Sequence, residues 1–386
     1  MNRYDNVTYY KTNYNSAMDK KLFGYIGFVK MSTISTYMSI YRVLFIVFLF
    51  ISQLGCRSDN IEPEKGPSIS FFYWKSRFKL QDPTKIWLDS IPVKKLYIRF
   101  FDVDVDVDQG PVPIAPLIGL PDHLAYSITP VLFVTNETFL KVREEGELVR
   151  LGDKLVTKLL QMSQQQNVKE WLIDCDWSPK TREIYFKFLR ILNVKAQKYN
   201  IRLMATIRLD QYKNYKMTGV PPVKSGLLMA YNMGDVDDWD TENSILNEKD
   251  ADLYLRNPSK YPIPLSLGLP FYQWGVVFRD FRFIRLINGL DESDLLDKSR
   301  FKSIGKYRYV TVRSTYLNGL YLYKGDHIRI EKIEALSILK MKKRLKDWRK
   351  VNINEEIVFF HLDESIINRE NGSFFRRFGQ KVSAGD

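Results

Sequence analysis

The stretch WLIDCDWS, residues 171–178, is the most informative part of the sequence for the fold. It begins as a short apolar run of the kind that forms a strand covered on both faces, and two acidic residues follow where the strand is expected to end. Because side chains alternate across a strand, Asp174 and Asp176 share one face and Cys175 takes the other. The stretch therefore predicts a buried strand that presents two carboxylates at its carboxyl end.

Eight such runs can be marked in the 386-residue chain, at 69–74, 96–101, 130–135, 170–174, 202–209, 226–232, 263–270 and 356–362. Helical patterns separate several of them, at 84–91 behind Pro83, at 152–165 and at 179–199. Eight parallel strands alternating with outer helices predict an α/β fold, the (β/α)8 or TIM barrel, over residues 68–386.

The surplus length of this barrel lies between its seventh and eighth strands. An α+β insertion is expected there at about 275–330. Its alternating runs read as hairpins that turn at Asn288-Gly289, Asn318-Gly319 and Gly325-Asp326.

A basic amphipathic helix is expected at 333–350. One interpretation is contact of its basic face with anionic lipid head groups. The interpretation that we favour is an outer barrel helix whose Leu336, Leu339 and Leu345 pack inward.

The first 55 residues are predicted to be a signal region. The apolar run 43–51 follows Arg42 and fits the core of a secretory signal, while it is too short to span a bilayer. The ending Leu54-Gly55-Cys56 resembles that of a bacterial lipoprotein signal, so lipidation of Cys56 is expected rather than ordinary cleavage nearby. The chain would then be a lipoprotein anchored in the bacterial cell envelope, on the outer-membrane or periplasmic side.

The start of translation and the tether follow from the same comparison. A signal begins only a few residues before its apolar core, so we expect translation to start at Met38 or Met31. Residues 1–37 would then not be translated. After Cys56 the polar, proline-bearing stretch up to residue 67 is expected to be a flexible tether.

The composition and charge of the chain argue against several classes of function. Lys and Arg total 58 against 45 Asp and Glu, a formal charge of +13, of which +4 belongs to residues 1–55. Much of the remainder lies on the basic helix, so we expect no nucleic-acid partner. The two cysteines exclude a disulfide scaffold, and neither a metal site nor a cofactor fingerprint is found.

Three strand endings together resemble the chitinase-type glycosidase family, which includes the endo-β-N-acetylglucosaminidases. The stretch Asp174-Cys-Asp176-Trp-Ser178 is similar to the family's Asp-x-Asp-x-Glu, the run LMAYN at 228–232 to its Met-x-Tyr-Asp, and LGLPFY at 267–272 to its Gly-x-Pro-x-Tyr. The family also carries an α+β insertion after its seventh strand. The resemblance implies a TIM barrel over roughly residues 68–363.

The resemblance also implies roles for these residues. Asp176, supported by Asp174, would orient the acetamido group of the sugar, with Tyr231 opposite. The family's acid, a Glu, is replaced by Ser178, whose hydroxyl cannot act as a raised-pKa carboxylic acid does. Asn232 replaces an Asp, and His361 is predicted at the place of the family's tryptophan floor.

Further candidates come from the strand ends themselves. A relocated acid would be Asp210, Glu137 or Asp102, used with Asp174 or Asp176. The predicted ligand-binding set combines these carboxylates with the aromatic residues of the barrel rim: Asp174, Asp176, Trp177, Tyr231, Asn232, Tyr272, Trp274 and His361.

The run Asp102-Val-Asp104-Val-Asp106-Val-Asp108 would place like charges on one face of a strand. Calcium, the neighbouring Arg99 and Arg208, or solvation on a surface loop could relieve the repulsion. Solvation is favoured over a metal.

The leading hypothesis is a glycan-binding lipoprotein without standard hydrolysis, whose glycan contains N-acetylhexosamine as the resemblance implies. The first alternative is an active glycoside hydrolase with a relocated acid. The second is a structural or interaction lipoprotein whose insertion docks a partner.

Overall fold

The computed structural model describes residues 67–142, 144–255, 260–344, 353–362, 364–367 and 374–375. The predicted signal region and Cys56 lie outside these residues, as does Leu345. None of the described helices is long and apolar enough to cross a bilayer.

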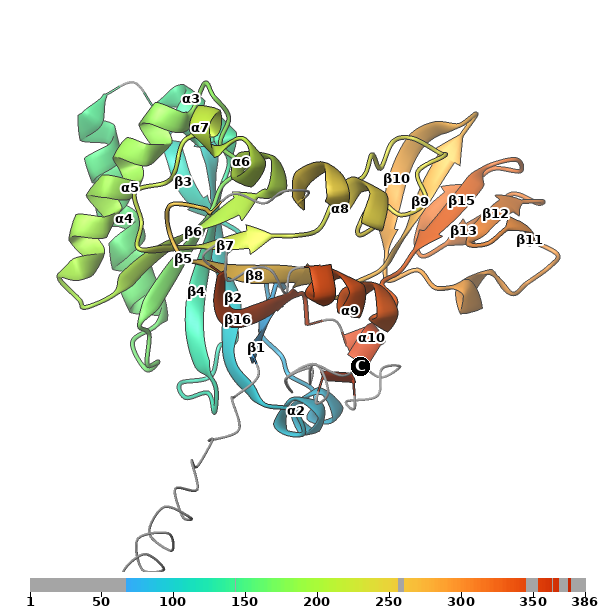
Figure 1. Ribbon diagram of the computed structural model, residues 1–386, viewed down its shortest axis with the longest axis horizontal. Coiled ribbons are helices and arrows are strands. Elements are labelled where there is room, and N and C mark those ends of the chain that lie inside the picture. Colours follow the sequence, from blue (N-terminus) through green and yellow to red (C-terminus); the bar gives the residue numbers. More distant parts are fainter. Residues whose placement is uncertain are drawn as a thin grey trace, which may run out of the picture. The chain divides into compact units, whose positions relative to one another are not determined.

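Parallel strands form a closed barrel, which confirms the predicted TIM fold (Figure 1). The strands are β1 (Ser68–Tyr73), β2 (Val93–Asp106), β4 (Ser127–Val134), β5 (Glu170–Asp174), β6 (Arg202–Arg208), β7 (Ser225–Met229), β8 (Leu265–Pro270) and β16 (Ile353–Phe360). They are hydrogen-bonded in the order β1-β16-β8-β7-β6-β5-β4-β2, and pairing of β1 with β2 closes the ring. One further strand, β3 (Gly110–Ile114), runs antiparallel to the long β2.

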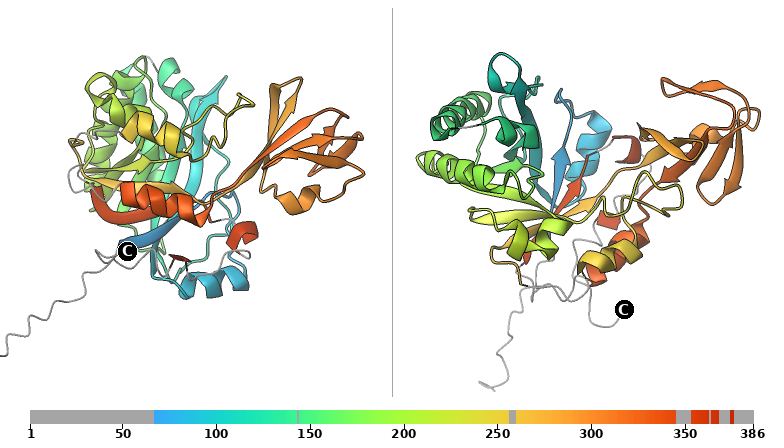
Figure 2. Two further views of the ribbon diagram at one scale, coloured as in Figure 1. Left: turned by 45° about the vertical axis from the view of Figure 1, so that its right-hand side comes forward. Right: turned by 90° about the horizontal axis from the view of Figure 1, so that it is seen from above.

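Helices cover the outside of the barrel. The described ones are α2 (Asp82–Asp89), α3 (Asn136–Lys141), α4 (Glu145–Met162), α5 (Arg182–Gln197), α6 (Leu209–Lys213), α7 (Tyr215–Thr218), α8 (Glu248–Leu255), α9 (Ala335–Arg344) and α10 (Glu364–Ile367). Helices α4 and α5 lie side by side (Figure 2). The predicted apolar stripe of α5, with Tyr185, Phe188, Leu189 and Leu192, is buried against the strands.

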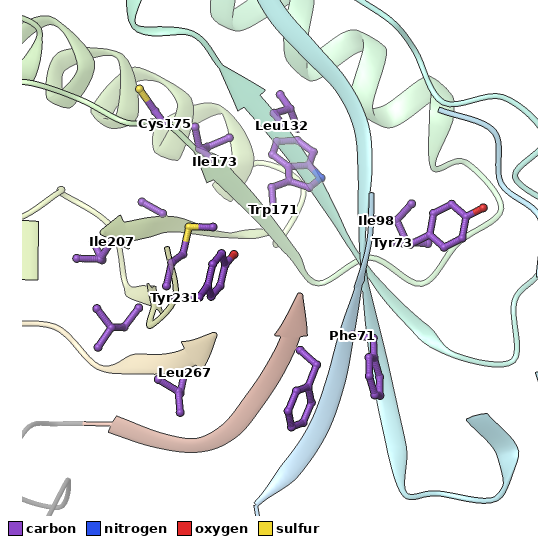
Figure 3. Close-up of a cluster of buried hydrophobic side chains, with 14 of the residues drawn as sticks. Phe71, Tyr73, Ile98, Leu132, Trp171, Ile173, Cys175, Ile207, Tyr231 and Leu267 are labelled. Carbon is purple, nitrogen blue, oxygen red and sulfur yellow. The ribbon is translucent and has the colours of Figure 1, made fainter. Parts of the chain in front are cut away.

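Alternation along the strands separates two layers of the core. Leu172 belongs to the cluster inside the barrel, together with Phe72 and Tyr97. Ile173 and Cys175 belong to the larger cluster between the strands and the helices, and Figure 3 shows both on the helix side of β5. The predicted phase of β5 is therefore confirmed: the side chain of Cys175 faces away from the carboxylates.

The insertion after the seventh barrel strand is an antiparallel sheet, as predicted. Its elements are β9 (Trp274–Arg279), β10 (Arg282–Asn288), the 3-10 helix η1 (Glu292–Leu295), β11 (Phe301–Gly305), β12 (Arg308–Thr311), β13 (Thr315–Leu317), β14 (Leu320–Leu322) and β15 (His327–Glu331). Five of these strands pair in the order β10-β9-β15-β12-β11, while β13 and β14 form a separate hairpin. That hairpin turns at Asn318-Gly319, where both residues have positive φ, as expected for an Asn-Gly turn.

The prediction of the first turn in the insertion was wrong. The hairpin of β9 and β10 turns at Asp280-Phe281, with φ of 49° and 59°, and Asn288 is the last residue of β10. A phenylalanine in a left-handed turn position has no sequence signature. The turn is therefore set by the pairing of the strands.

The predicted inward face of the basic helix was also wrong. Leu336 and Leu339 of α9 are 59% and 40% exposed, whereas Ile338 and Met341 are buried. Ile338 and Met341 are three positions apart and so share a stripe, which is rotated away from the two leucines.

A buried ion pair ties the insertion to the loop after β7. Arg329 and Glu331 are fully buried, and Arg329 Nε donates to Glu331 Oε1 over 2.6 Å. Glu331 Oε2 also accepts from the backbone N–H and the hydroxyl of Ser244 and from Trp274 Nε1. Trp274 is thus held in a fixed orientation.

Candidate functional site

The carboxyl-terminal end of the barrel, called the mouth below, gathers side chains from four of the strands. Asp174 ends β5, Arg208 ends β6, Tyr231 follows β7, and Phe360 ends β16. Each lies in the inward phase of its strand, because Leu172, Met204, Leu227 and Val358 lie inside the barrel. In parallel α/β barrels this end carries the functional residues.

Asp174 is a nearly buried carboxyl group, with 4% of its surface exposed. One carboxylate oxygen accepts a hydrogen bond from Thr206 Oγ1 over 2.7 Å. Burial raises its pKa to about 6, and repulsion by Asp176 and Asp102 adds to this, while Arg208 and the Thr206 hydrogen bond oppose it. A carboxyl group with this pKa holds a proton over part of the physiological range.

Asp176 is half exposed and is paired with Arg208. The guanidinium donates through Nη2 to Oδ2 over 2.8 Å and through Nε to Oδ1, a bidentate arrangement. The orientation of Asp176 is therefore fixed by a charged neighbour on β6.

Tyr231 lies beside these groups and is 3% exposed. No described residue lies within hydrogen-bonding distance of its hydroxyl. Burial raises the pKa of this hydroxyl well above its usual range, and Arg208, Asp174 and Asp176 all act on it electrostatically. Figure 3 shows its ring among the ends of the barrel strands. A buried hydroxyl without a partner carries a desolvation penalty that a bound ligand could remove.

Aromatic rings line the mouth beside these polar groups, near the ends of β1, β8 and β16. The ring of Phe360 stacks on Tyr231 with centroids 5.4 Å apart and an interplanar angle of 22°, and it meets Trp74 at 5.5 Å. Tyr272 meets Trp274 edge to face at 5.2 Å, and its hydroxyl donates to Asn232 Oδ1. Trp74, Trp274 and Phe360 are partly exposed, so their rings are available to a ligand.

The structure places Phe360, rather than the predicted His361, against Tyr231. His361 is stacked on Tyr272 at 6.4 Å, one position outside the stack. The inward phase of β16, with Val358 inside the barrel, is the signal that could have identified Phe360.

Other predicted site residues are not brought to this group. Trp177 packs its ring on Tyr185 of α5 at 5.4 Å and donates Nε1 to Thr218 O. Asp210 is exposed on α6 and accepts from Asn214 Nδ2, and Glu137 is exposed on α3, where it pairs with Lys141 at 3.5 Å.

Ser178 sits in the turn that leads into α5. Its backbone N–H donates to Thr181 Oγ1 over 2.9 Å, and the two hydroxyl oxygens are 3.2 Å apart. Thr181 Oγ1 in turn donates to Asn136 Oδ1 over 2.5 Å. Ser178 thus belongs to a hydrogen-bonded helix start.

The acidic run is relieved by protein groups. Arg99 donates to both oxygens of Asp102, over 2.7 and 2.5 Å, and Asp104 accepts from Thr135 Oγ1 over 2.8 Å. Asp106 caps the turn between β2 and β3. Across the described part of the chain, no three acidic, histidine or cysteine side chains are grouped so as to hold a metal ion.

Comparison with known proteins supports the fold. No family model and no curated protein matches the chain. Solved structures do: the spore cortex-lytic enzyme SleL of Bacillus megaterium QM B1551 matches with a TM-score of 0.51 and 14% identity, over 83% of this chain and 76% of that one. A chitinase from Chromobacterium violaceum ATCC 12472 matches with a TM-score of 0.50 and 10% identity, over 82% and 100%. SleL of Bacillus cereus matches with a TM-score of 0.50 and 13% identity, over 81% and 74%. The chain thus has a barrel similar to those of chitinases and cortex-lytic enzymes.

Proposed function

We propose that this chain binds a glycan at the mouth of its barrel and does not hydrolyse it by the chitinase mechanism. The carrying observation is the grouping of Asp174, Asp176 and Tyr231 at the mouth, in a chain with a serine where the resemblance places the acid. The carboxylates and the hydroxyl suit a polar sugar face, and the rings of Trp74, Trp274 and Phe360 suit an apolar one.

The lack of hydrolysis rests on Ser178. Protonation of a glycosidic oxygen needs an acid whose pKa lies near the working pH, and an alcohol is far too weak. The hydrogen bonds of Ser178 with Thr181 further hold it in the start of α5. Binding would then proceed without cleavage of the bound sugar.

Isothermal titration of the full chain with N-acetylglucosamine oligomers, preceded by a glycan array, tests binding. We expect at least one glycan to bind, and Tyr231→Phe to weaken it. A folded chain that binds no glycan on the array would overturn the proposal.

A fluorogenic chito-oligosaccharide tests hydrolysis. We expect no turnover by the wild type. Ser178→Glu, with Ser178→Gln as the matched control, tests whether a carboxylic acid at position 178 is sufficient to produce hydrolysis. Turnover by the wild type would overturn the non-hydrolytic part.

The alternative of a relocated acid retains one specific observation, the pKa of about 6 at Asp174. Among the candidate relocated acids, Asp102 is the one whose charge acts on Asp174, across the intervening strand β4. If the wild type does turn over substrate, Asp174→Asn and Asp102→Asn should each abolish the activity, whereas Asp210→Asn should not.

We also propose that the protein is a membrane-anchored envelope lipoprotein, supported by the sequence around Cys56 alone. Metabolic labelling with a fatty-acid probe tests this. Cys56→Ser should abolish labelling, while Cys175→Ser should not, because Cys175 is buried in the core. Unchanged labelling of Cys56→Ser would contradict lipidation there.

An interaction role for the insertion remains the further alternative, and exposed aromatic residues favour it. Tyr316, Tyr321 and Tyr323 on and beside the β13–β14 hairpin are all exposed, with neighbouring centroids 4.9 and 5.0 Å apart. Replacing the three with serine should leave glycan binding at the mouth unchanged; if it abolishes binding of the glycan, the ligand lies on the insertion.

A further inference from the structure

The mouth of the barrel is acidic, although the chain as a whole carries a formal charge of +13. Four carboxylates reach it, those of Asp102, Asp104, Asp174 and Asp176, against the two guanidinium groups of Arg99 and Arg208. Asp102 and Asp104 flank Val103, which is buried on the helix side, so both carboxylates lie on the opposite face of β2. The excess of negative charge is therefore local to this end of the molecule.

The loop after β7 adds to the charge at the same end of the barrel. Residues 232–243 contain five exposed acidic side chains and no Lys or Arg: Asp235, Asp237, Asp238, Asp240 and Glu242. Arg308 and Arg329 contact this loop through its backbone, at the carbonyl oxygens of residues 236, 238 and 241. These contacts leave the carboxylates directed to solvent, where they attract cations.

The hydroxyl of Tyr231 is a second observation at the mouth. It is buried, it has no partner among the described residues, and it lies within the electrostatic range of Asp174 and Asp176. A tyrosine hydroxyl can accept a hydrogen bond from an ammonium group and donate one to a sugar oxygen. An acidic mouth that also holds an unpaired hydrogen-bond acceptor suits a cationic ligand.

We propose that the glycan bound at the mouth carries free ammonium groups, as an oligomer of unacetylated glucosamine does. This inference rests on the proposed glycan-binding function and specifies its ligand class. The ammonium groups would face the four carboxylates and the Tyr231 hydroxyl, and the sugar rings would lie on the aromatic residues around Phe360. An N-acetylated sugar carries no charge and gains none of this attraction.

The charge on the mouth also changes with pH. Asp174 faces Asp102, Asp176, Arg208 and the hydroxyl of Thr206, and it becomes ionised as the pH passes about 6. Affinity for a cationic sugar should therefore rise between pH 5 and pH 7. In the Asp174→Asn variant this rise should be absent.

Isothermal titration of the full chain with glucosamine tetramer and with N-acetylglucosamine tetramer tests the proposal. At low ionic strength the glucosamine oligomer should bind about ten-fold more tightly, and the difference should shrink as salt is added. Asp104→Asn and Asp176→Asn should reduce that preference about three-fold or more. Asp153→Asn, on the outer helix α4, is the matched control and should leave it unchanged.

The outcomes separate the two proposals. If the acetylated tetramer binds equally well or better, the charge inference is overturned and glycan binding stands. If Asp153→Asn reduces the preference as much as Asp104→Asn, the effect comes from total charge and not from the mouth, which also overturns the inference. If neither tetramer nor any other glycan binds, the proposed function itself fails.

Discussion

The two ends of the barrel each hold a carboxyl group on the inner face, and the two groups differ in how many hydrogen-bond partners the protein gives them. At the amino-terminal end Glu356 accepts from Ser70 Oγ at 2.9 Å, Tyr97 Oη at 2.9 Å and Ser266 Oγ at 3.1 Å. Lys95 Nζ lies 3.1 Å from its Oε1 and 2.7 Å from Glu170 Oε2, so its positive charge is shared between the two carboxylates. Every strong acceptor direction of this carboxylate is thus used within the protein.

At the mouth Asp174 has the hydroxyl of Thr206 as its hydrogen-bond donor among the described side chains, and Arg208 is engaged by Asp176. Burial raises the pKa of Asp174 to about 6, because Arg208 and the Thr206 hydroxyl oppose it only in part, and beside it lies a tyrosine hydroxyl without a partner among the described residues. A satisfied polar cluster stabilises a fold and has nothing to offer a ligand, whereas an unsatisfied one is destabilising until a ligand arrives. The comparison indicates a structural role for the amino-terminal cluster and supports the mouth as the proposed binding site.

The largest effect is expected from Glu356→Ala. It leaves three hydroxyl groups without their acceptor in a largely buried site and leaves Lys95 paired with Glu170 alone, and should lower the free energy of unfolding by about 3–5 kcal/mol. Urea denaturation measures this. Glu183→Ala, whose side chain is 71% exposed on α5, should change it by less than about 0.5 kcal/mol. Equal effects would remove the distinction between the satisfied cluster and an ordinary surface ion pair.

Asp174→Asn should raise the free energy of unfolding at neutral and alkaline pH. The folded pKa of about 6 lies above the ordinary value of 3.8, so the contribution of Asp174 to stability is fully present below pH 4 and is lost as the pH rises through 6. The asparagine variant escapes this loss and should be more stable at pH 8 by about 3 kcal/mol, with the difference vanishing near pH 4. Denaturation of both proteins from pH 4 to 8 checks the trend. A variant that is less stable at every pH would show that the charge of Asp174 is needed for folding.

A smaller effect is expected from Arg208→Met. Because Arg208 lowers the pKa of Asp174, its removal should raise that pKa above about 6 by roughly one unit. Carbon-detected NMR titration of the carboxyl group measures it. Arg202→Met, which removes an exposed partner of Glu170 at the other end of the barrel, should leave the pKa of Asp174 unchanged.

The ends of the strands could be predicted because side chains alternate along a strand with a period of two. This alternation indicates both which residues are buried and to which face each side chain points. The apolar run before Asp174 established that β5 is buried, and alternation then put Asp174 and Asp176 inside and Cys175 outside. The same rule failed for β16, where consecutive residues Phe360 and His361 are both aromatic. Choosing between them requires the phase of the strand, which is set by its pairing with β8 and β1.

Helix α9 and the first hairpin of the insertion show where local patterns are ambiguous. Apolar side chains at 336, 338, 339 and 341 are compatible with more than one buried stripe, and only packing selects Ile338 and Met341. The turn at Asp280-Phe281 lacks glycine and asparagine, so strand pairing imposes a backbone that the residues themselves do not favour. Arg208 and Thr206 became site residues for a further reason: β6 is the hydrogen-bonded neighbour of β5, although Thr206 lies 32 residues after Asp174 in the sequence.

The smallest change in stability is expected from Tyr231→Phe, and this variant separates the two ends of the barrel most sharply. Removing a hydroxyl that has no partner should change the free energy of unfolding by less than about 0.5 kcal/mol. Tyr97→Phe removes the same atom from the other end, where it donates to Glu356, and should lower that free energy by about 1–2 kcal/mol. Glycan affinity should show the reverse order, with a loss for Tyr231→Phe and none for Tyr97→Phe. If Tyr231→Phe is as destabilising as Tyr97→Phe and binds glycan as well as the wild type, the Tyr231 hydroxyl serves the fold, and the mouth loses the feature that distinguishes it from the amino-terminal cluster.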